Sequence, residues 1–382
     1  MTEVRISQKA VTSPIFRVKG QRSRWRYPDE RLTPEHCEII RNINMSERGV
    51  AESRFGYAAY NDTKLAGNEP AIGMYQTKFR DGSDRRIILT ATKAYNDDGT
   101  TRSTITGTAL TGSLDQRARF EFLKNQIIFN NGKDPMRVWS GSTSSNTAAL
   151  ATVPFTKNVD FMVHKNLLLA AGTTEGGTYY PTRLRWCDIN RKTYIVDITN
   201  WPTDNMYEIY DGGSPIVGCV DAWGKALIFK EDGLYVGEIY YDQLGHYDFR
   251  LENPIRGFSP IAKMSLIARP EFVFGIAREG AFLIRPDLTF QIISFDDDDQ
   301  WRDLNQNRIQ YAQSFIREKD HQVRTLLSTS ANSTSHDIIM VFDWETGDIS
   351  WDLPVDKLNY AQRVVIDDEE LDWFGDDGGN LL

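Results

Sequence analysis

Two similar β-hairpin patterns follow one another in the middle of the chain. In the stretch KALIFKEDGLYVGEI, an apolar run reaches a charged turn that ends at Gly233, and a second apolar strand follows at once. The stretch FVFGIAREGAFLIRP repeats this pattern, with Gly280 standing 47 residues after Gly233. Glycine supplies the positive φ that tight turns require, and apolar residues on both sides give paired strands a buried face. Because a four-stranded propeller blade takes about 40–50 residues, this spacing predicts a radial array of blades.

Apolar strand cores of the same kind recur along the chain, and most of them precede a polar or glycine-containing turn. We therefore expect an all-β fold, a β-propeller of about six to eight four-stranded blades with an extended N-terminal arm. Irregular spacing near residues 140–200 and 295–337 predicts long loops between strands. Helices should be few and short, and the best helix start is at Thr33. The strand cores are residues 86–89, 126–129, 166–169, 226–229, 271–274, 337–340 and 370–373.

The ends of the chain suggest how such a propeller would close. We assign residues 1–60 to an N-terminal arm and blade-closing segment, and residues 61–382 to the propeller. The last unit stops just after the acidic turn at residues 376–379, as if it ended within a blade. An open propeller would expose strand edges that invite association, so we expect a strand from residues 1–20 to complete it. The candidate strands are residues 4–6 and 15–18.

Charge and composition narrow the class of protein. The formal net charge of -9 and the pI near 5.2 do not fit a protein that wraps nucleic acid by neutralising phosphates. Cys37, Cys187 and Cys219 are widely spaced, so we expect reduced structural thiols rather than a disulfide framework. The N-terminus has no apolar segment of the secretory type, and no run is long enough to span a membrane. We expect a soluble protein made in a cytoplasm, without membrane insertion.

Sequence motifs of catalysis are missing from the chain. The sequence has no GxSxG elbow, no P-loop, no GxGxxG after a strand and no HExxH, and its five histidines are isolated from one another. The four carboxylates at residues 296–299 lack the alternating spacing and following glycine of a calcium loop, so we interpret them as a solvated loop. Residues 376–379 are interpreted as an acidic turn. We therefore expect a protein that is not an enzyme and that has no metal or cofactor.

A basic, aromatic segment near the N-terminus is the local exception in this acidic chain. Arginine beside tryptophan is typical of interface anchors, so the segment is interpreted as a docking arm for an acidic partner surface. A solvated edge strand that carries basic residues against aggregation is an equal alternative. The residues proposed to dock are Arg17, Lys19, Arg22, Arg24, Trp25 and Arg26.

Two parts of the chain resemble a known family. The first is residues 41–57, in which an Asn-containing strand leads through a Ser and Gly turn; its matching positions are Asn44, Ser46, Gly49, Arg54 and Gly56. The second is the order of two blade-like segments, VHKNLLLAAG at residues 163–172 and LIFKEDGLY at residues 227–235. Together they resemble the β-propeller proteins of bacteriophage tails, which include the tail tubular (nozzle) protein B and the packaged-DNA stabilisation proteins of short-tailed phages.

The resemblance implies a structural protein of the virion, located in the tail or neck and synthesised in the cytoplasm of the host bacterium. Such proteins form a ring, usually hexameric, below the portal and its adaptor, which retains packaged DNA and forms the channel for its ejection. The implied partners are other copies of the chain, the portal and adaptor, and tail fibre or spike proteins. Double-stranded DNA would pass through the ring without sequence-specific binding. Loops near residues 140–150 and 173–182 would be gate or fibre-docking elements.

A propeller that acts on polysaccharide or binds sugar is the alternative function. A glycoside hydrolase would bring carboxylates from several blades together, and an adhesin would stack sugars on aromatic side chains. Trp201, Trp223 and Trp301 are the candidate aromatic platforms.

Overall fold

The computed structural model describes most of the chain from Tyr60 onward. The described residues are 43–45, 51–53, 60, 63–99, 101–190, 193, 195–241, 247–252, 255–294, 298–330, 334–366 and 368–382.

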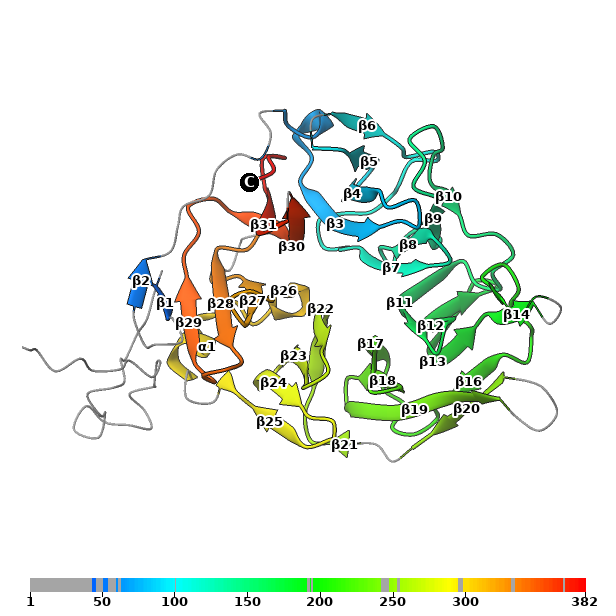
Figure 1. Ribbon diagram of the computed structural model, residues 1–382. Helices are drawn as coiled ribbons and strands as arrows, with labels where there is room; N and C mark the ends of the chain where they lie inside the picture. Colours follow the sequence, from blue (N-terminus) through cyan, green and yellow to red (C-terminus); the bar gives the residue numbers. More distant parts are fainter. Residues whose placement is uncertain are drawn as a thin grey trace, which may run out of the picture.

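Six antiparallel sheets, each with four strands hydrogen-bonded in chain order, are arranged around a common axis (Figure 1). Blade 1 consists of β3 (Ala71–Lys78), β4 (Asp84–Thr90), β5 (Ala94–Asp97) and β6 (Arg102–Thr104). Blade 2 consists of β7 (Arg119–Leu123), β8 (Gln126–Asn130), β9 (Arg137–Trp139) and β10 (Ala148–Ala149). Blade 3 consists of β11 (Lys157–His164), β12 (Leu167–Glu175), β13 (Thr178–Trp186) and β16 (Met206–Glu208).

The next three blades repeat the arrangement, and in each the first strand is the innermost. Blade 4 consists of β17 (Ile216–Ala222), β18 (Lys225–Lys230), β19 (Gly233–Tyr241) and β20 (Tyr247–Leu251), with β21 (Ile255–Arg256) also paired to β19. Blade 5 consists of β22 (Pro260–Ala268), β23 (Val273–Ala277), β24 (Gly280–Ile284) and β25 (Phe290–Ile292). Blade 6 consists of β26 (Gln313–Arg317), β27 (Gln322–Leu327), β28 (Ile338–Asp343) and β29 (Ile349–Asp352).

A seventh sector, blade 7, lies between blades 6 and 1 (Figure 1). It contains the hairpin of β30 (Leu358–Ile366) and β31 (Glu369–Asp376), and β30 contacts both β26 and β3. After β31 the chain turns back and pairs with it again, through a bridge between Gly375 and Leu381. The sevenfold arrangement is therefore made of six four-stranded sheets and one sheet that is built differently.

The two ends of the propeller meet in blade 7. The N–H of Tyr60 donates to the carbonyl oxygen of Leu381, and the N–H of Leu65 donates to that of Gly379, both at 2.9 Å. Residues 379–382 thus occupy the position next to β31, and Tyr60 and Leu65 are bonded to them. Because both ends contribute to one sheet, blade 7 can separate only if these contacts break.

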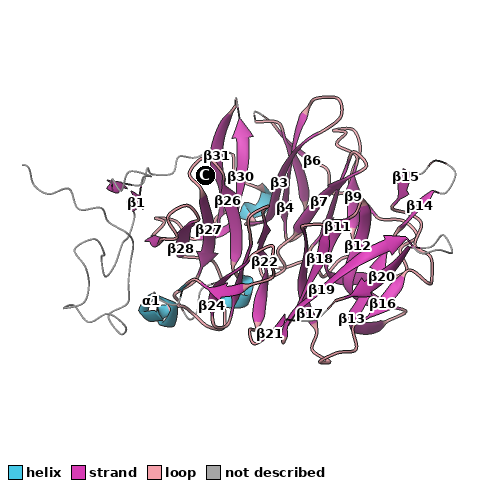
Figure 2. Cartoon of the chain, turned by 60° about the horizontal axis from the view of Figure 1, so that its bottom comes forward, coloured by secondary structure: helices cyan, strands magenta, loops and turns pink. Residues whose placement is uncertain are grey.

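The core is formed where the faces of neighbouring blades pack together. Strands such as β12, β18 and β23 have buried residues at successive positions, as expected for strands covered on both faces. Trp139, Trp186, Trp351 and Trp373 are among the largest fully buried side chains. Seen from the side, the strands of successive blades stand next to one another across the thickness of the body (Figure 2).

The propeller predicted from the sequence is confirmed, and the strand cores fall on regular positions. All but one of them lie wholly or partly in the second strand of a blade; residues 337–340 fall in β28, the third strand of blade 6. The closing strands expected at residues 4–6 and 15–18 lie outside the described residues, as does Thr33. Among the described residues, Tyr60 and Leu65 are the ones bonded to the C-terminal residues Leu381 and Gly379.

One expectation about loops was wrong. Residues 173–182 belong to a hairpin of β12 and β13, whose turn is only Gly176–Gly177 between the paired residues Glu175 and Thr178. Residues 140–147 form a loop, as expected, and the indole N–H of Trp139 donates to the carbonyl oxygens of Ser142 and Ser145 in it, each at 3.1 Å.

The other irregular stretches contain short elements. The hairpin of β14 (Asp188–Asn190) and β15 (Ile195–Asp197) projects from blade 3. The connection into blade 6 holds α1 (Asp298–Asp303) and the 3-10 turn η4 (Ile309–Tyr311), and η2 (Ala66–Asn68) precedes β3. The N-terminal strands β1 (Ile43–Met45) and β2 (Ala51–Ser53) pair with each other, and β1 lies beside β29 (Figure 1).

Candidate functional site

Charged side chains gather on the innermost strands, around the axis of the propeller. Arg119 and Asp160 lie on β7 and β11, and Arg119 Nη1 is 3.6 Å from Asp160 Oδ2. The same Asp160 oxygen accepts the backbone N–H of Cys219 in β17 at 2.8 Å. Asp160 is almost fully buried, and a buried charge needs partners. The guanidinium of Arg119 and the N–H of Cys219 supply them. One carboxylate therefore links blades 2, 3 and 4.

A lysine extends this cluster across the axis. Lys263, on β22 of blade 5, donates from Nζ to the carbonyl oxygen of Val159 in blade 3 at 2.8 Å. Burial lowers the pKa of Lys263, while the charge of Asp160 acts in the opposite direction. The bond joins two blades that are not neighbours.

The next residue on the same strand also reaches across. Met264 packs against an apolar cluster that includes Met74 of blade 1 and Tyr360 and Trp373 of blade 7. Its flexible thioether side chain is suited to filling an irregular space. Side chains of non-adjacent blades therefore contact one another at this level.

Glu121 is the acidic group in this region whose protonation is most strongly affected by its surroundings. It lies two residues after Arg119 on β7. Burial raises its pKa from 4.5 to about 7; Arg119 opposes this, and the charges of Asp160 and Asp221 add to it. The group consequently changes charge close to neutral pH.

A histidine–aspartate pair lies between blades 3 and 4. His164 is fully buried, and its Nδ1 contacts a carboxylate oxygen of Asp221. Its Nε2 accepts the backbone N–H of Ile239 at 3.2 Å, so Nδ1 carries the proton that is donated to Asp221. Because both ring nitrogens are occupied, this arrangement holds two blades together and leaves no free nitrogen for proton transfer to a substrate.

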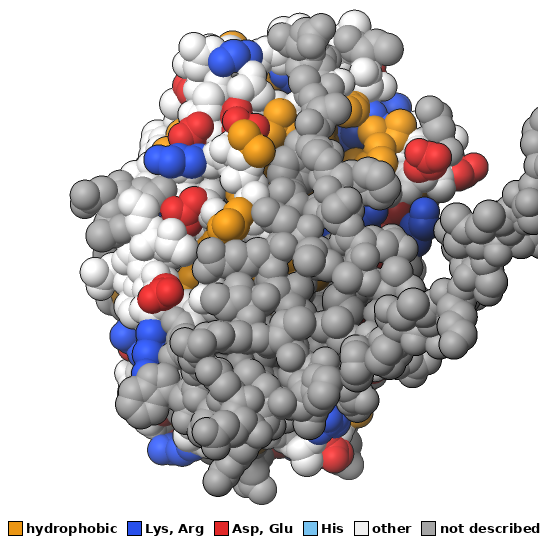
Figure 3. Space-filling model, turned by 90° about the vertical axis from the view of Figure 1, so that its left-hand side faces the viewer, with side chains coloured by type: hydrophobic (Ala, Val, Ile, Leu, Met, Phe, Trp, Pro, Cys, Tyr) orange, Lys and Arg blue, Asp and Glu red, His pale blue; other side chains and the backbone are white. Residues whose placement is uncertain are grey.

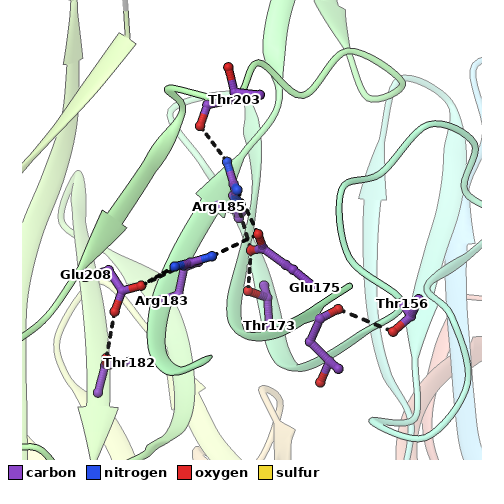
Figure 4. Close-up of polar contacts among 9 residues, drawn as sticks. Thr156, Thr173, Glu175, Thr182, Arg183, Arg185, Thr203 and Glu208 are labelled. Atoms are coloured by element: carbon purple, nitrogen blue, oxygen red, sulfur yellow. Dashed lines mark hydrogen bonds and ion pairs between the residues drawn. The ribbon is translucent and has the colours of Figure 1, made fainter. Parts of the chain in front are cut away.

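An ion-pair network covers the outer strands of blade 3 (Figure 4). Glu175 accepts from Arg185 Nη2 at 2.8 Å and from Arg183 Nη1 at 2.9 Å. Arg183 also donates to Glu208, through Nε at 2.7 Å. Burial would raise the pKa of Glu175, but hydrogen bonds from Arg185 and Thr173 and the two arginine charges lower it.

The arrangement of this network fits a structural role. Glu175, Arg183 and Glu208 come from β12, β13 and β16, so the pairs run across three adjacent strands. The side chains are only 9–15% exposed, and each carboxylate is paired. Mutual neutralisation of this kind fixes the long hairpin of blade 3 and leaves no unpaired charge for a ligand.

Most of the site residues predicted from the sequence cannot be placed. Arg17, Lys19, Arg22, Arg24, Trp25 and Arg26 lie outside the described residues, as do Ser46, Gly49, Arg54 and Gly56. Asn44 lies in β1, where it is paired with Glu52 of β2.

The two turn glycines occupy equivalent positions in blades 4 and 5. Gly233 and Gly280 each begin the third strand, with φ of +146° and +144°. Each is paired with the last residue of the second strand, so the hairpin repeat that the sequence indicated is confirmed. They have a structural role as the first residues of these strands.

The aromatic platforms suggested for sugar binding are largely inaccessible. Trp201 and Trp301 are only 8% and 7% exposed, which leaves little surface for stacking on a sugar. Trp223 is partly exposed, and its indole N–H donates to the carbonyl oxygen of Pro270 at 2.8 Å. Trp201 and Trp301 are therefore core side chains.

The acidic runs behave differently from one another. Asp376 accepts the N–H groups of Gly378 and Asn380 at 2.9 and 2.6 Å, so residues 376–379 form the predicted acidic turn. Of residues 296–299, the last two begin α1, and the first two lie outside the described residues.

Sequence reasoning missed the charges at the axis. Arg119, Asp160 and Lys263 each interrupt an apolar strand pattern, in RFEFL, VDFMV and PIAKMSL. A lone charge in such a pattern indicates a buried ion pair, because an unpaired buried charge is unstable. The identity of its partner depends on how blades are placed around the axis, which the sequence pattern does not reveal.

Metal-ligand clusters and membrane-spanning helices are both missing from the described residues. No three His, Cys, Asp or Glu side chains in these ranges are grouped as metal ligands. Within the same ranges, no helix is both long and apolar enough to span a membrane.

Comparisons with known proteins show the fold alone. The chain matches no protein-family model and no curated protein. It is similar to the extracellular domain of a putative one-component system from B. thetaiotaomicron, with a TM-score of 0.53 and 11% identity over 85% of this chain and 40% of that one. It is also similar to the Pan2 WD40 domain from Neurospora crassa, with a TM-score of 0.49 and 11% identity over 85% of this chain and 92% of that one.

Proposed function

We propose that this chain is a structural protein of a tailed bacteriophage, one subunit of a ring in the tail nozzle, hub or neck. The observation that carries the proposal is the position of the family-like segments in the fold. Residues 163–172 span the β11–β12 turn of blade 3, and residues 227–235 span the β18–β19 turn of blade 4. Residues 41–57 precede Tyr60, where blade 7 closes.

The side chains near the axis bear on where DNA would pass in such an assembly. Lys263 and Met264 reach from blade 5 to residues of non-adjacent blades and so narrow the axis of a single propeller at this level. The DNA path is therefore the opening enclosed by several copies, with each propeller serving as a rigid wall element. Contacts around this ring, which we expect to be hexameric, are heterologous and closing. An acidic protein lets DNA slide past without strong binding.

Exposed tyrosines on blades 3 and 4 are the side chains that we assign to contacts between copies. Tyr210 is 85% exposed, Tyr241 61% and Tyr179 49%. Tyrosine is enriched at the energetic centres of protein interfaces, where it buries a large rigid surface. Figure 3 shows the opposite side of the molecule from blade 3, and on its described surface acidic and basic side chains are interspersed with a few hydrophobic ones.

Mass photometry of the purified full chain tests the proposal. We expect a discrete ring species, alone or after addition of the portal and adaptor proteins, and a shift toward monomers in the double variant Tyr210→Ser with Tyr241→Ser. Val355→Ser is the matched control, because Val355 is an exposed apolar side chain between blades 6 and 7. Monomers alone, even with portal and adaptor present, would overturn the ring.

The polysaccharide alternative has a separate test. Release of reducing ends from capsular or cell-wall polysaccharide, abolished by a single carboxylate substitution, would establish an enzyme in place of the structural function. The proposed function predicts no release above buffer. It also predicts no difference between the wild-type chain and such a variant.

A further inference from the structure

Two arginines from non-adjacent connections lie close together. Arg117 stands just before β7, in the connection from blade 1 to blade 2, and Arg308 stands just before η4, in the connection from blade 5 to blade 6. The two connections meet through an ion pair of 2.8 Å between Arg308 Nη2 and Asp115 Oδ1. Like charges are thus held together in a buried region, which requires a compensating charge.

The hydrogen bonds of Arg117 go only to neutral groups, so none of these partners balances its positive charge. Its Nε donates to the carbonyl oxygen of Asn359 at 2.9 Å, and Nη1 donates to that of Leu114 at 3.2 Å. The residue is 2% exposed, and its Nη2 is buried without a hydrogen-bond partner in the described part of the chain. A buried donor without a partner costs about 1–3 kcal/mol, and more when it is charged.

Arg308 also retains an unused donor. Its Nη2 donates to the carbonyl oxygen of Thr334 at 3.0 Å, and its guanidinium lies 4.2 Å from the centre of the Tyr311 ring. Its Nε is buried and, among the described residues, has no hydrogen-bond partner. Asp115, with a side chain 38% exposed, is the carboxylate shared by the two arginines.

The groups around the arginines add no negative charge. His336 is buried, and burial together with the charges of Arg117 and Arg308 holds its pKa well below its usual range, so it is neutral. Asn359 is 1% exposed, and both polar atoms of its side-chain amide lack partners within the described ranges. Two guanidinium groups therefore share one carboxylate, which leaves a net positive charge and unused donors.

We propose that Arg117 and Arg308 bind a compact oxyanion, a phosphate or carboxylate group, that enters from the side of Asp115. The planar guanidinium matches the paired oxygens of such groups and gives short, charge-assisted hydrogen bonds. Arg117 Nη2 and Arg308 Nε are the donors available to it. Asp115 competes with the ligand for Arg308, because its carboxylate already contacts that guanidinium. This site is independent of the proposed ring.

Isothermal titration calorimetry of the full chain tests the site, with inorganic phosphate and acetate used as separate ligands. Chloride keeps the ionic strength constant. The key variant is Asp115→Asn, which removes a partly exposed competing charge; we expect it to bind the oxyanion roughly three- to tenfold more tightly. We expect Arg308→Gln to lose binding. Arg256→Gln is the matched control, because Arg256 is an exposed arginine paired with the single carboxylate Asp211, and it should bind as the wild type does.

The outcomes separate the ligand classes. Binding of phosphate but not acetate identifies a phosphate site, and the reverse identifies a carboxylate site; tighter binding by Asp115→Asn supports either. If neither anion binds the wild type or Asp115→Asn, the proposal is wrong. It is equally overturned if Asp115→Asn binds no more tightly than the wild type, or if Arg256→Gln loses as much affinity as Arg308→Gln.

Discussion

Gly233 and Gly280 occupy positions at which any larger side chain would clash with neighbouring atoms. A Cβ on Gly233 would lie 2.3 Å from the carbonyl oxygen of Ile255, and one on Gly280 would lie 2.2 Å from Ser294 Oγ. The sequence pattern identified both turns correctly. It could not reveal these contacts, because they come from chain segments that return to the third strand after the turn.

We expect Gly233→Ala to destabilise the protein by about 1–3 kcal/mol more than Gly213→Ala. Gly213 also has positive φ, +68°, but a Cβ added there would meet no atom within 4 Å. The larger loss at Gly233 therefore combines the clash with Ile255 and a φ of +146° that is less accessible to alanine than the φ of Gly213. Urea unfolding followed by tryptophan fluorescence measures both, and equal losses would show that the contact with Ile255 is unimportant.

Glu121 is the residue whose charge should make stability depend on pH. Its pKa is raised to about 7 in the folded protein from 4.5, so the ionised form is disfavoured by folding. Its contribution is fully present below pH 4.5 and is lost as the pH rises through about 7. Glu121→Gln should therefore be more stable than the wild type at pH 8, on the order of 1–3 kcal/mol, with the difference shrinking toward pH 5. Thermal unfolding at the two pH values checks this; a constant difference would contradict it.

At the scale of elements, blade 7 depends most on contacts between distant parts of the chain. Strands within a blade are close in sequence, and their apolar cores and turns were predictable from local pattern alone. The pairing of Tyr60 and Leu65 with Leu381 and Gly379 joins the two ends of the described propeller, and local pattern contains no signal for it. The same limit explains why the extended β12–β13 hairpin was mistaken for a loop.

Leu381→Ala should destabilise the protein by about 2–5 kcal/mol, because it leaves a cavity where a fully buried side chain closes blade 7. Leu371→Ala is the matched control, since Leu371 lies in β31 of the same blade but is 41% exposed. Chemical denaturation of both variants measures the difference. A loss for Leu371→Ala as large as that for Leu381→Ala would mean that the C-terminal residues do not close the propeller.

At the scale of the whole molecule, charged side chains on the innermost strands tie the blades to one another. Arg119, Asp160, Cys219 and Lys263 connect four blades around that axis. The circular arrangement was predictable from repeated hairpins, whereas the axial cluster depends on which blades face each other. Under the proposed function, further copies of the chain would contact the outer surfaces of this body.

The most direct test of the proposed function is an electron cryomicroscopy reconstruction of virions of the tailed phage that, under this proposal, encodes the chain. The account predicts that a ring of propellers with this fold, of the order found by mass photometry, surrounds the DNA path below the portal, with the DNA between copies and not along any propeller axis. A reconstruction in which this chain is missing from the tail and neck would contradict the account.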